Sequence, residues 1–559
     1  MQDFPTNTYA AWRKAVETEL KGASFDERMV TRTAEGITLR PLYLRADTAN
    51  VPALSAFRSV VPLGLDAGGN TGWDVSQEIT VPSAAEFNHQ ARNSLASGLN
   101  ALNMVLDKAT RNGADPDWAR PEEVGSGGLS IATQRDLDRA LDGIDLKNTS
   151  LFVRSGASGM PFATVLVASM RRRKQQLSRL RGCIETDPLG VLAHEGRLPQ
   201  SLPGAYREMA SLTRWAAEKA PLLQTICVHS RAWHESGGNA VQELAFTLAT
   251  AVEYLREMQE RELDVDVVAP RMRFAITTGT RFFLEIAKLR ALRILWARVV
   301  AALSGNADAQ RLNLHVRTSL WNKTTRDPHN NILRATVEAF AGALGGCDSM
   351  QVGAFDEVIR PPDDFSRRLA RNTQLVLQKE CQLTRVADPV GGSWFVESLT
   401  SELAEKAWAL FQEVEKLGGM AAALRAEFPQ KAVAASAAER ISAVNDRRAV
   451  VVGVNQYANP TETPLAVPAA DTTPFHKRRA QQVASHRTSL DDPDNDAVLK
   501  CLSNIVNVRG EGLFEACAAA VAAGATLGEI VRAVRIHDRP CAPIAPVCLT
   551  RATAFIEKH

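Results

Sequence analysis

Short apolar segments that alternate with longer helical patterns most strongly constrain the fold of this chain. Most of the segments are near-continuous apolar runs that end in polar or glycine-rich stretches. The expected strands are residues 99–107, 149–156, 182–188, 225–233, 271–279, 312–321, 348–356 and 384–393. Strands that are buried on both faces and joined by helical crossovers are typical of parallel sheets. Eight such units predict an α/β fold in which a closed (β/α)8 TIM barrel is favoured over an open sheet.

An amphipathic helix is expected near the start of the chain. Trp12, Val16 and Leu20 fall on one face of a helix over residues 8–22, and a Lys-Gly pair ends the pattern. After this helix the chain is irregular to about residue 70. We therefore expect residues 1–70 to form an arm whose apolar face packs against a neighbouring surface.

A helical region follows the expected barrel, which we place at residues 71–400. Residues 401–559 contain long helical patterns, and one further strand is expected at residues 447–457. Several prolines and a His-Lys-Arg-Arg cluster in residues 458–490 are typical of a linker or belt. The sequence thus predicts an N-terminal helical arm, a barrel and a C-terminal helical linker or belt region.

Composition and charge restrict the class of protein. The 559 residues are 45% apolar and 23% charged, as in ordinary soluble globular proteins, and a net charge of +2 is too small for a nucleic-acid-binding surface. The chain starts without a secretory signal and has no run of about 18 apolar residues that could span a membrane. Eight scattered cysteines without a C-x-x-C pair give no support for a disulfide framework or a zinc site. We expect a cytoplasmic protein that binds neither nucleic acid nor membrane.

Five long strings of residues are specific enough to indicate a family. They are RTSLWNKTTRDPHNNILRATVEAFAGALGG, VGAFDEVIRPPDDFSRRLARNTQLVLQKE, RVADPVGGSWFVESLT, RFFLEIAKLRALRILWA and VVVGVNQY. With them, nearly the whole chain resembles the acyl-CoA mutases that use adenosylcobalamin, above all methylmalonyl-CoA mutase. The resemblance implies a barrel threaded by the acyl-CoA chain, an N-terminal arm for subunit contact, and a belt that leads to a separate cobalamin domain.

One position near the barrel entrance departs from the catalytic pattern. Catalytic members of the family carry W-x-x-x-Q-Y, whose tyrosine contacts the substrate and helps to drive homolysis of the carbon–cobalt bond. Residues 73–79 of this chain read WDVSQEI, so Glu78 stands where the tyrosine is expected. A carboxylate cannot stack or donate as a phenol does, and it would repel a substrate carboxylate.

The stretch CVHSRAWHESGGNA, residues 227–240, contains a second departure. Catalytic members read G-Y-H-M-Q-E-A-G-A here, and their histidine hydrogen-bonds the acyl carbonyl. Alignment without gaps places Ala232 at the histidine position. His234 lies two residues later and would share the face of Ala232 only if the strand continued that far. His234 is therefore either a replacement acid or a structural or exposed histidine.

A third pattern, H-x-Q-T-S-G-W, is matched at His315 and Trp321, but Arg317 replaces its glutamine and Leu320 its glycine. Leucine in place of glycine narrows the space that is available to a substrate. The resemblance implies a vestigial acyl-CoA pocket at Glu78, Ala232, His234, His315, Arg317 and Trp321. We assign no catalytic, cofactor-binding or metal-binding residue.

The cobalamin signature of the family is incomplete in this chain. Base-off cobalamin domains carry D-x-H-x-x-G, and their histidine ligates cobalt. The nearest string is RIHDRPCAP, in which His537 lacks both the aspartate and the glycine, and only about 20 residues follow. We therefore expect no complete cobalamin-binding domain and no cofactor bound by this chain in that mode.

Three hypotheses follow from the resemblance. In the first, this chain is the small, non-catalytic subunit of a heterodimeric methylmalonyl-CoA mutase, and adenosylcobalamin is held by a large catalytic subunit; the strings WDVSQEI and IETDPLG look like that small subunit. In the second, it is the active barrel subunit of a split mutase of the isobutyryl-CoA type, with cobalamin on a separate small protein. In the third, it is a stand-alone acyl-CoA-binding or assembly protein.

Overall fold

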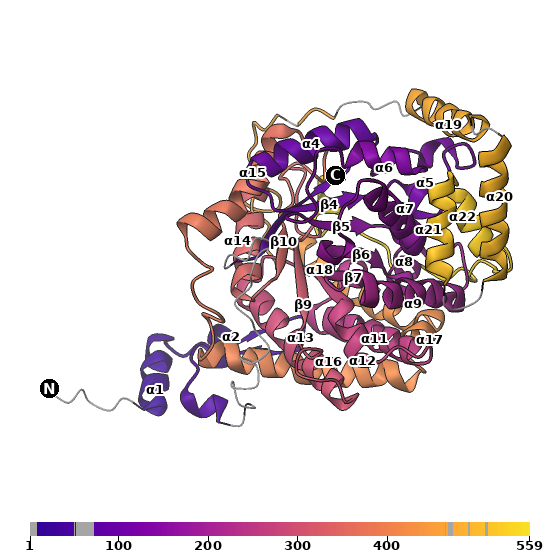
Figure 1. Cartoon of the computed structure of the whole chain (residues 1–559). Coiled ribbons are helices and arrows are strands. Elements are labelled where there is room, and N and C mark those ends of the chain that lie inside the picture. Colours follow the sequence, from indigo (N-terminus) through magenta and orange to yellow (C-terminus); the bar gives the residue numbers. More distant parts are fainter. Residues whose placement is uncertain are drawn as a thin grey trace.

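A closed barrel of eight parallel strands forms the centre of the protein (Figure 1). The computed structural model describes residues 8–49, 51, 72–463, 465–467, 473–489, 492–508 and 512–558. Around the barrel the strand order is β10-β3-β4-β5-β6-β7-β8-β9. The strands are β3 (Asp74–Ile79), β4 (Ala101–Val105), β5 (Ser150–Arg154), β6 (Gly182–Thr186), β7 (Leu223–His229), β8 (Met272–Thr278), β9 (Asn313–Thr318) and β10 (Ser349–Gln351). The predicted TIM barrel is confirmed.

One predicted barrel strand is wrong and one barrel strand was missed. Residues 384–393 form turns that lead into a helix, whereas the missing strand is β3. This strand is not a continuous apolar run, because Ser76 and Glu78 point into the barrel. The strand expected at residues 447–457 is also wrong, since this part of the chain forms turns with an isolated bridge between Val452 and Gln456.

Helices surround the barrel and extend beyond it on two sides. Those up to residue 302 are α1 (Tyr9–Glu19), α2 (Phe25–Met29), α4 (Ala84–Ala96), α5 (Lys108–Arg111), α6 (Gln134–Ala140), α7 (Gly159–Arg172), α8 (Pro188–Glu195), α9 (Leu202–Lys219), α10 (Arg231–His234), α11 (Ala240–Gln259), α12 (Val265–Val268) and α13 (Phe282–Ala302). Those that follow are α14 (Asn330–Leu344), α15 (Asp364–Leu375), α16 (Trp394–Lys416), α17 (Met420–Arg425), α18 (Phe428–Asn445), α19 (Thr473–Thr488), α20 (Asp492–Asn507), α21 (Leu513–Ala523), α22 (Leu527–Val534) and α23 (Ala554–Lys558). None of these helices is long and apolar enough to cross a membrane.

The core lies between the strands and the surrounding helices. On α13, for example, the ring of Trp296 packs edge-on against Phe274 of β8, with 4.8 Å between ring centroids. Both side chains are fully buried, and burying one such side chain contributes roughly 1.5–3 kcal/mol. Contacts of this kind fix the ends of the barrel strands, where (β/α)8 proteins carry their functional groups.

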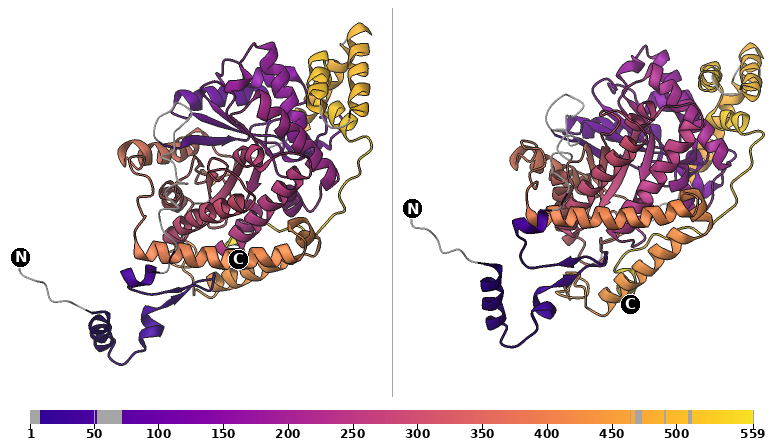
Figure 2. Two further views of the ribbon diagram at one scale, coloured as in Figure 1. Left: turned by 60° about the horizontal axis from the view of Figure 1, so that its bottom comes forward. Right: turned by 90° about the horizontal axis from the view of Figure 1, so that it is seen from below.

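Helix α1 stands away from the barrel (Figure 2). The prediction of a helix over residues 8–22 is confirmed, because Thr8 caps a helix that begins at Tyr9. Trp12, Val16 and Leu20 are half-buried, whereas most of the other side chains of this segment are exposed. The ring of Trp12 packs edge-on against Phe25 of α2, with 6.0 Å between centroids.

The C-terminal part of the chain packs beside α7 and then returns to the barrel. The segment 458–490, expected to be a linker or belt, contains α19. Arg479 anchors this helix, since its buried guanidinium lies 2.9 Å from the Asp136 carboxylate. Residues 541–552, here called the C-terminal strap, then run back to the strand ends (Figure 2). Backbone N–H groups of the strap donate to the carbonyls of Gly196, Glu235 and Trp321. The strap therefore ties together the loops that follow β6, β7 and β9.

Candidate functional site: the strand ends of the barrel

A cavity of about 90 Å³ lies at the carboxyl ends of β5, β6 and β7. Its basic and imidazole side chains are Arg111, Arg154, His194, His229 and Arg231. Its acidic side chains are Glu185, Asp187 and Glu195. Burial and the neighbouring Arg154 and Arg317 lower the pKa of Arg231 to about 10, which shows how closely the positive charges are crowded. The wall thus carries three guanidinium groups and three carboxyl groups.

The loop after β7 places Ala232 in this cavity and His234 outside it. Strand β7 ends at His229, and α10 begins at Arg231, so the strand does not continue to His234. Ala232 lines the cavity and brings no hydrogen-bonding side chain to it. His234 is buried elsewhere, with Nδ1 2.9 Å from a Glu243 carboxylate oxygen and Nε2 3.0 Å from the Ser319 hydroxyl.

His234 belongs to a buried polar network behind the strand ends. The Lys288 ammonium donates to Glu243 at 2.7 Å and forms an ion pair with Glu285 at 2.5 Å, and its exposed side-chain fraction is 1%. Burial opposes ionisation of Glu243, but Lys288 and His234 more than offset it and lower the pKa of Glu243 to about 2. Both ring nitrogens of His234 are used inside the protein, and the ring is therefore held in place rather than presented to a ligand.

Glu78 is held by two arginines inside the barrel. Its carboxylate accepts from Arg154 of β5 at 2.6 Å and from Arg317 of β9 at 3.3 Å, and Arg317 also donates to Glu357 at 2.8 Å. Burial raises the pKa of Glu78, but the two guanidinium groups lower it by more. The pKa of Glu78 therefore lies well below its usual range. Two of the departures from the catalytic pattern, Glu78 and Arg317, thus compensate each other in charge.

His315 and Trp321, which match the family pattern, lie apart from each other. Burial and the charge of Arg273 lower the pKa of His315 well below its usual range, and its Nδ1 lies 3.0 Å from the Ser349 hydroxyl. Trp321 packs under α18, with the guanidinium of Arg440 4.7 Å from its ring centroid. Its side chain does not line the cavity at the strand ends.

Sequence reasoning missed a group of residues that fills the barrel interior. Arg273 of β8 is completely buried, and its guanidinium carbon lies 3.5 Å from the ring centroid of Phe152 on β5. It donates to the Ser349 hydroxyl at 3.0 Å and lies 3.6 Å from the Glu185 carboxylate. A charged residue inside the apolar string RMRFAITTG was the available signal.

A second cavity, of about 220 Å³, lies at the amino ends of the strands. Phe152 and Ser349 form part of its wall, whereas Glu185 lines the cavity at the carboxyl ends. Arg273 contacts all three of these side chains. The two cavities share no lining residue in the described part of the chain, and Arg273 contacts side chains from the walls of both.

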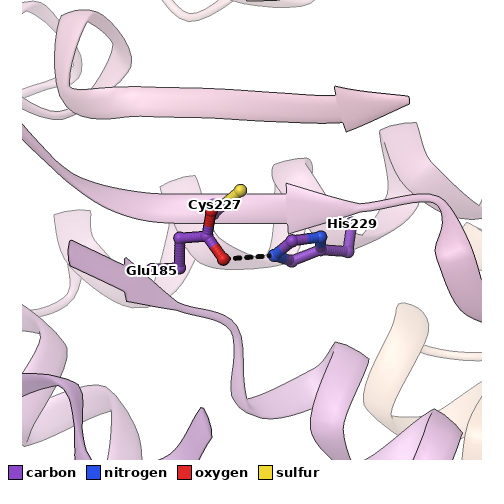
Figure 3. A group of neighbouring side chains, drawn as sticks. All are labelled: Glu185, Cys227 and His229. Carbon is purple, nitrogen blue, oxygen red and sulfur yellow. Dashed lines mark hydrogen bonds and ion pairs between the residues drawn. The ribbon is translucent and has the colours of Figure 1, made fainter. Parts of the chain in front are cut away.

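Glu185, Cys227 and His229 form the one cluster of possible metal ligands found among the described residues (Figure 3). The His229 Nε2 lies 3.1 Å from the Glu185 carboxylate. Burial opposes ionisation of Glu185, but His229 and Arg273 lower its pKa to about 2. Burial raises the pKa of the Cys227 thiol well above its usual range.

Comparison with known proteins identifies the family. A family model described as methylmalonyl-CoA mutase matches residues 32–538. A methylmalonyl-CoA mutase of Cereibacter sphaeroides is 35% identical over 535 residues, which cover 95% of this chain and 75% of that protein. The chain belongs to the methylmalonyl-CoA mutase family.

Two relatives of this mutase family member, both from Streptomyces virginiae, carry subunit names. The large subunit of a methylmalonyl-CoA mutase is 33% identical over 538 residues, covering 94% of this chain and 73% of that protein. The small subunit is 35% identical over 483 residues, covering 84% of this chain and 74% of that protein. Because the two identities are so similar, they do not assign the chain to either subunit type.

Proposed function

We propose that this chain is the small, non-catalytic subunit of a heterodimeric methylmalonyl-CoA mutase. Its large partner would hold adenosylcobalamin, the source of the radicals, and would interconvert methylmalonyl-CoA and succinyl-CoA. The observation that carries the proposal is the buried contact of Arg273 with Phe152 inside the barrel. An acyl-CoA chain that threads the barrel would have to displace a buried charge from its partners, which is costly.

The side chains at the strand ends support the same assignment. Ala232 offers no proton donor to an acyl carbonyl, and His234, two residues on, is occupied by Glu243 and Ser319. Glu78 is neutralised by Arg154 and Arg317 and has no phenol to offer. Without positioned groups of this kind a rearrangement loses most of its catalysis.

The described residues do not fit a cobalt ligand of the family type. His537 is exposed in the loop after α22. Two residues before it stands Arg535 rather than an aspartate, and its guanidinium donates to Glu208 at 2.7 Å. We therefore derive no step of the reaction through cobalamin in this chain and place the cofactor with the partner.

We propose that the arm, residues 1–70, and exposed apolar side chains on the surface of the protein contact the partner. Residues 401–559 would serve as the belt. Leu333 on α14 and Phe365 on α15 are 67% and 53% exposed, and Tyr457 is 75% exposed. In the proposed complex the partner covers these apolar side chains. The subunit names of the Streptomyces virginiae relatives are in keeping with such a partner.

The test is an assay of the purified full-length chain with adenosylcobalamin, alone and with a large mutase subunit that retains the tyrosine, the histidine and D-x-H-x-x-G. We expect no conversion of methylmalonyl-CoA by the chain alone. We expect a one-to-one complex in sedimentation analysis and turnover by that complex. Turnover with only a cobalamin-carrying small protein would overturn the proposal in favour of a split mutase, and acyl-CoA binding without turnover or a partner would favour a stand-alone binder.

The matched variant is Arg231→Ala, which changes the cavity wall but not the arm. If this chain is non-catalytic, the complex with Arg231→Ala should turn over as fast as the complex with the unchanged chain. A large fall in the turnover number with unchanged assembly would mean that the cavity takes part in the reaction.

A further inference from the structure

Three side chains that can bind a metal ion meet inside the barrel near the strand ends (Figure 3). Cys227 and His229 are two residues apart on β7, so their side chains leave the strand on the same face. Glu185 comes from the neighbouring strand β6, with its carboxylate facing the imidazole ring. One ligand atom from each residue lies within 4.8 Å of the other two.

We propose that Glu185, Cys227 and His229 form a zinc site with three protein ligands and a fourth position open toward the cavity at the strand ends. Zinc accepts thiolate, imidazole and carboxylate ligands at about 2.0–2.3 Å, so tetrahedral ligand atoms lie roughly 3.3–3.8 Å apart. Glu185 and His229 are already 3.1 Å apart. The widest separation in the cluster therefore has to close by about 1 Å at most.

The charges of this donor set match a divalent ion. A thiolate and a carboxylate together carry two negative charges, and the imidazole is neutral when it ligates. Binding therefore forms Zn–S, Zn–N and Zn–O bonds and releases the thiol proton, and any proton that the imidazole carries, to solvent. No oxidant or other co-reactant is needed.

The neighbouring positive charge of Arg273 is directed at the other carboxylate oxygen. Its guanidinium lies 3.6 Å from Oε1 of Glu185, whereas His229 lies against Oε2. Arg273 opposes a cation by its charge, but the two anionic ligands offset that repulsion. Its contact also orients the carboxylate so that Oε2 is directed to the ion, as outer groups do in many metal sites.

The fourth position falls in the 90 Å³ cavity, because Glu185 and His229 both line it. Arg154 and Arg231 belong to the same wall and favour water or an anion there. Three protein ligands with one open position are the arrangement of zinc sites that bind or activate a ligand, rather than of closed structural sites. The site does not depend on the proposed subunit role.

The experiment loads the full-length chain with Zn²⁺ alone, removes the excess by dialysis and measures zinc per chain by mass spectrometry. We expect about one equivalent in the unchanged chain and a loss of it in Cys227→Ser and in His229→Gln. Cys347→Ser is the matched control, since Cys347 is a buried thiol that lies outside the cluster. It should keep its zinc, and circular dichroism of each variant reports whether it folds.

Two measurements on the unchanged chain remain decisive if a variant does not fold. Co²⁺ in place of Zn²⁺ should give a thiolate-to-cobalt charge-transfer band, and Zn²⁺ should slow alkylation of Cys227 more than that of Cys517, which is buried in α21. Absence of bound zinc and of the band, or equal loss of zinc in Cys347→Ser, would overturn the assignment.

Discussion

Replacement of Glu78 by glutamine should destabilise the protein measurably, because Glu78 balances two buried arginines. The exposed side-chain fractions of Glu78, Arg154 and Arg317 are only 11%, 19% and 11%. Removing one partner of a buried ion pair costs about 3–5 kcal/mol. Arg317 keeps its 2.8 Å contact with Glu357, so only Arg154 loses its carboxylate, and we expect the lower end, about 3 kcal/mol.

This free energy converts to a shift of the melting temperature. With an unfolding entropy of about 2.1 cal/mol/K per residue, the 559 residues give about 1.2 kcal/mol/K, so Glu78→Gln should melt about 2–3 °C lower. Scanning calorimetry at one scan rate measures the shift. The double variant Glu78→Gln/Arg154→Gln should recover part of it, because the uncompensated charge is gone.

The control is Glu17→Gln, the same change in an exposed ion pair with Arg13 at 2.9 Å. Exposed pairs of this type contribute little, and we expect no measurable shift. If Glu78→Gln has the same melting temperature as Glu17→Gln, other groups balance the arginines of the barrel. The proposed charge compensation between Glu78 and Arg317 is then refuted.

Three further predictions concern other parts of the chain. Lys323→Met removes the partner of Glu338, which lies 2.6 Å away, and both side chains are 0% exposed. The free energy of unfolding measured in urea should therefore fall by about 3–5 kcal/mol, and Glu338→Leu in the same chain should restore part of it. Lys288 and His234 hold the pKa of Glu243 below its usual range, so Glu243 stabilises the protein above the ordinary carboxyl pKa and this effect is lost as the pH falls through the lowered value. In Glu243→Gln the free energy of unfolding should therefore fall less steeply as the pH is lowered. An unchanged pH dependence would contradict the lowered pKa of Glu243. Trp12→Ala should leave the melting temperature unchanged but weaken the complex with the large subunit in sedimentation analysis, because α1 stands off the barrel.

The barrel could be predicted because most of its strands contain several buried apolar residues, such as Phe274 and Ile276 of β8. Where that physical rule fails, the prediction fails as well. Strand β3 was missed because it has only two apolar residues, Val75 and Ile79. Its polar residues Ser76 and Glu78 find their partners on other strands of the barrel. The string TRVADPVGGS has apolar residues but forms turns, and Asp388 within it takes a positive φ of 46°, which a strand does not allow.

The site was predictable only in part. The positions of Glu78 and Ala232 came from resemblance, and the structure adds what they contact. Glu185 and His229 come from different strands, 44 residues apart, so no local spacing such as C-x-x-C could bring them together in a sequence pattern. Arg273 likewise meets Phe152 only when the barrel closes.

The C-terminal strap also has a consequence for the order in which the protein forms during synthesis. The last barrel strand, β10, ends at Gln351. Ala552 of the strap, which donates to the carbonyl of Trp321, is made about 200 residues after the end of β10. At roughly 5–20 residues per second, a ribosome needs about 10–40 s to cover that distance. During this interval all eight strands exist while the loops at their carboxyl ends still lack the strap. The loops at this end of the barrel therefore gain their hydrogen bonds to the strap only after all eight strands have been made.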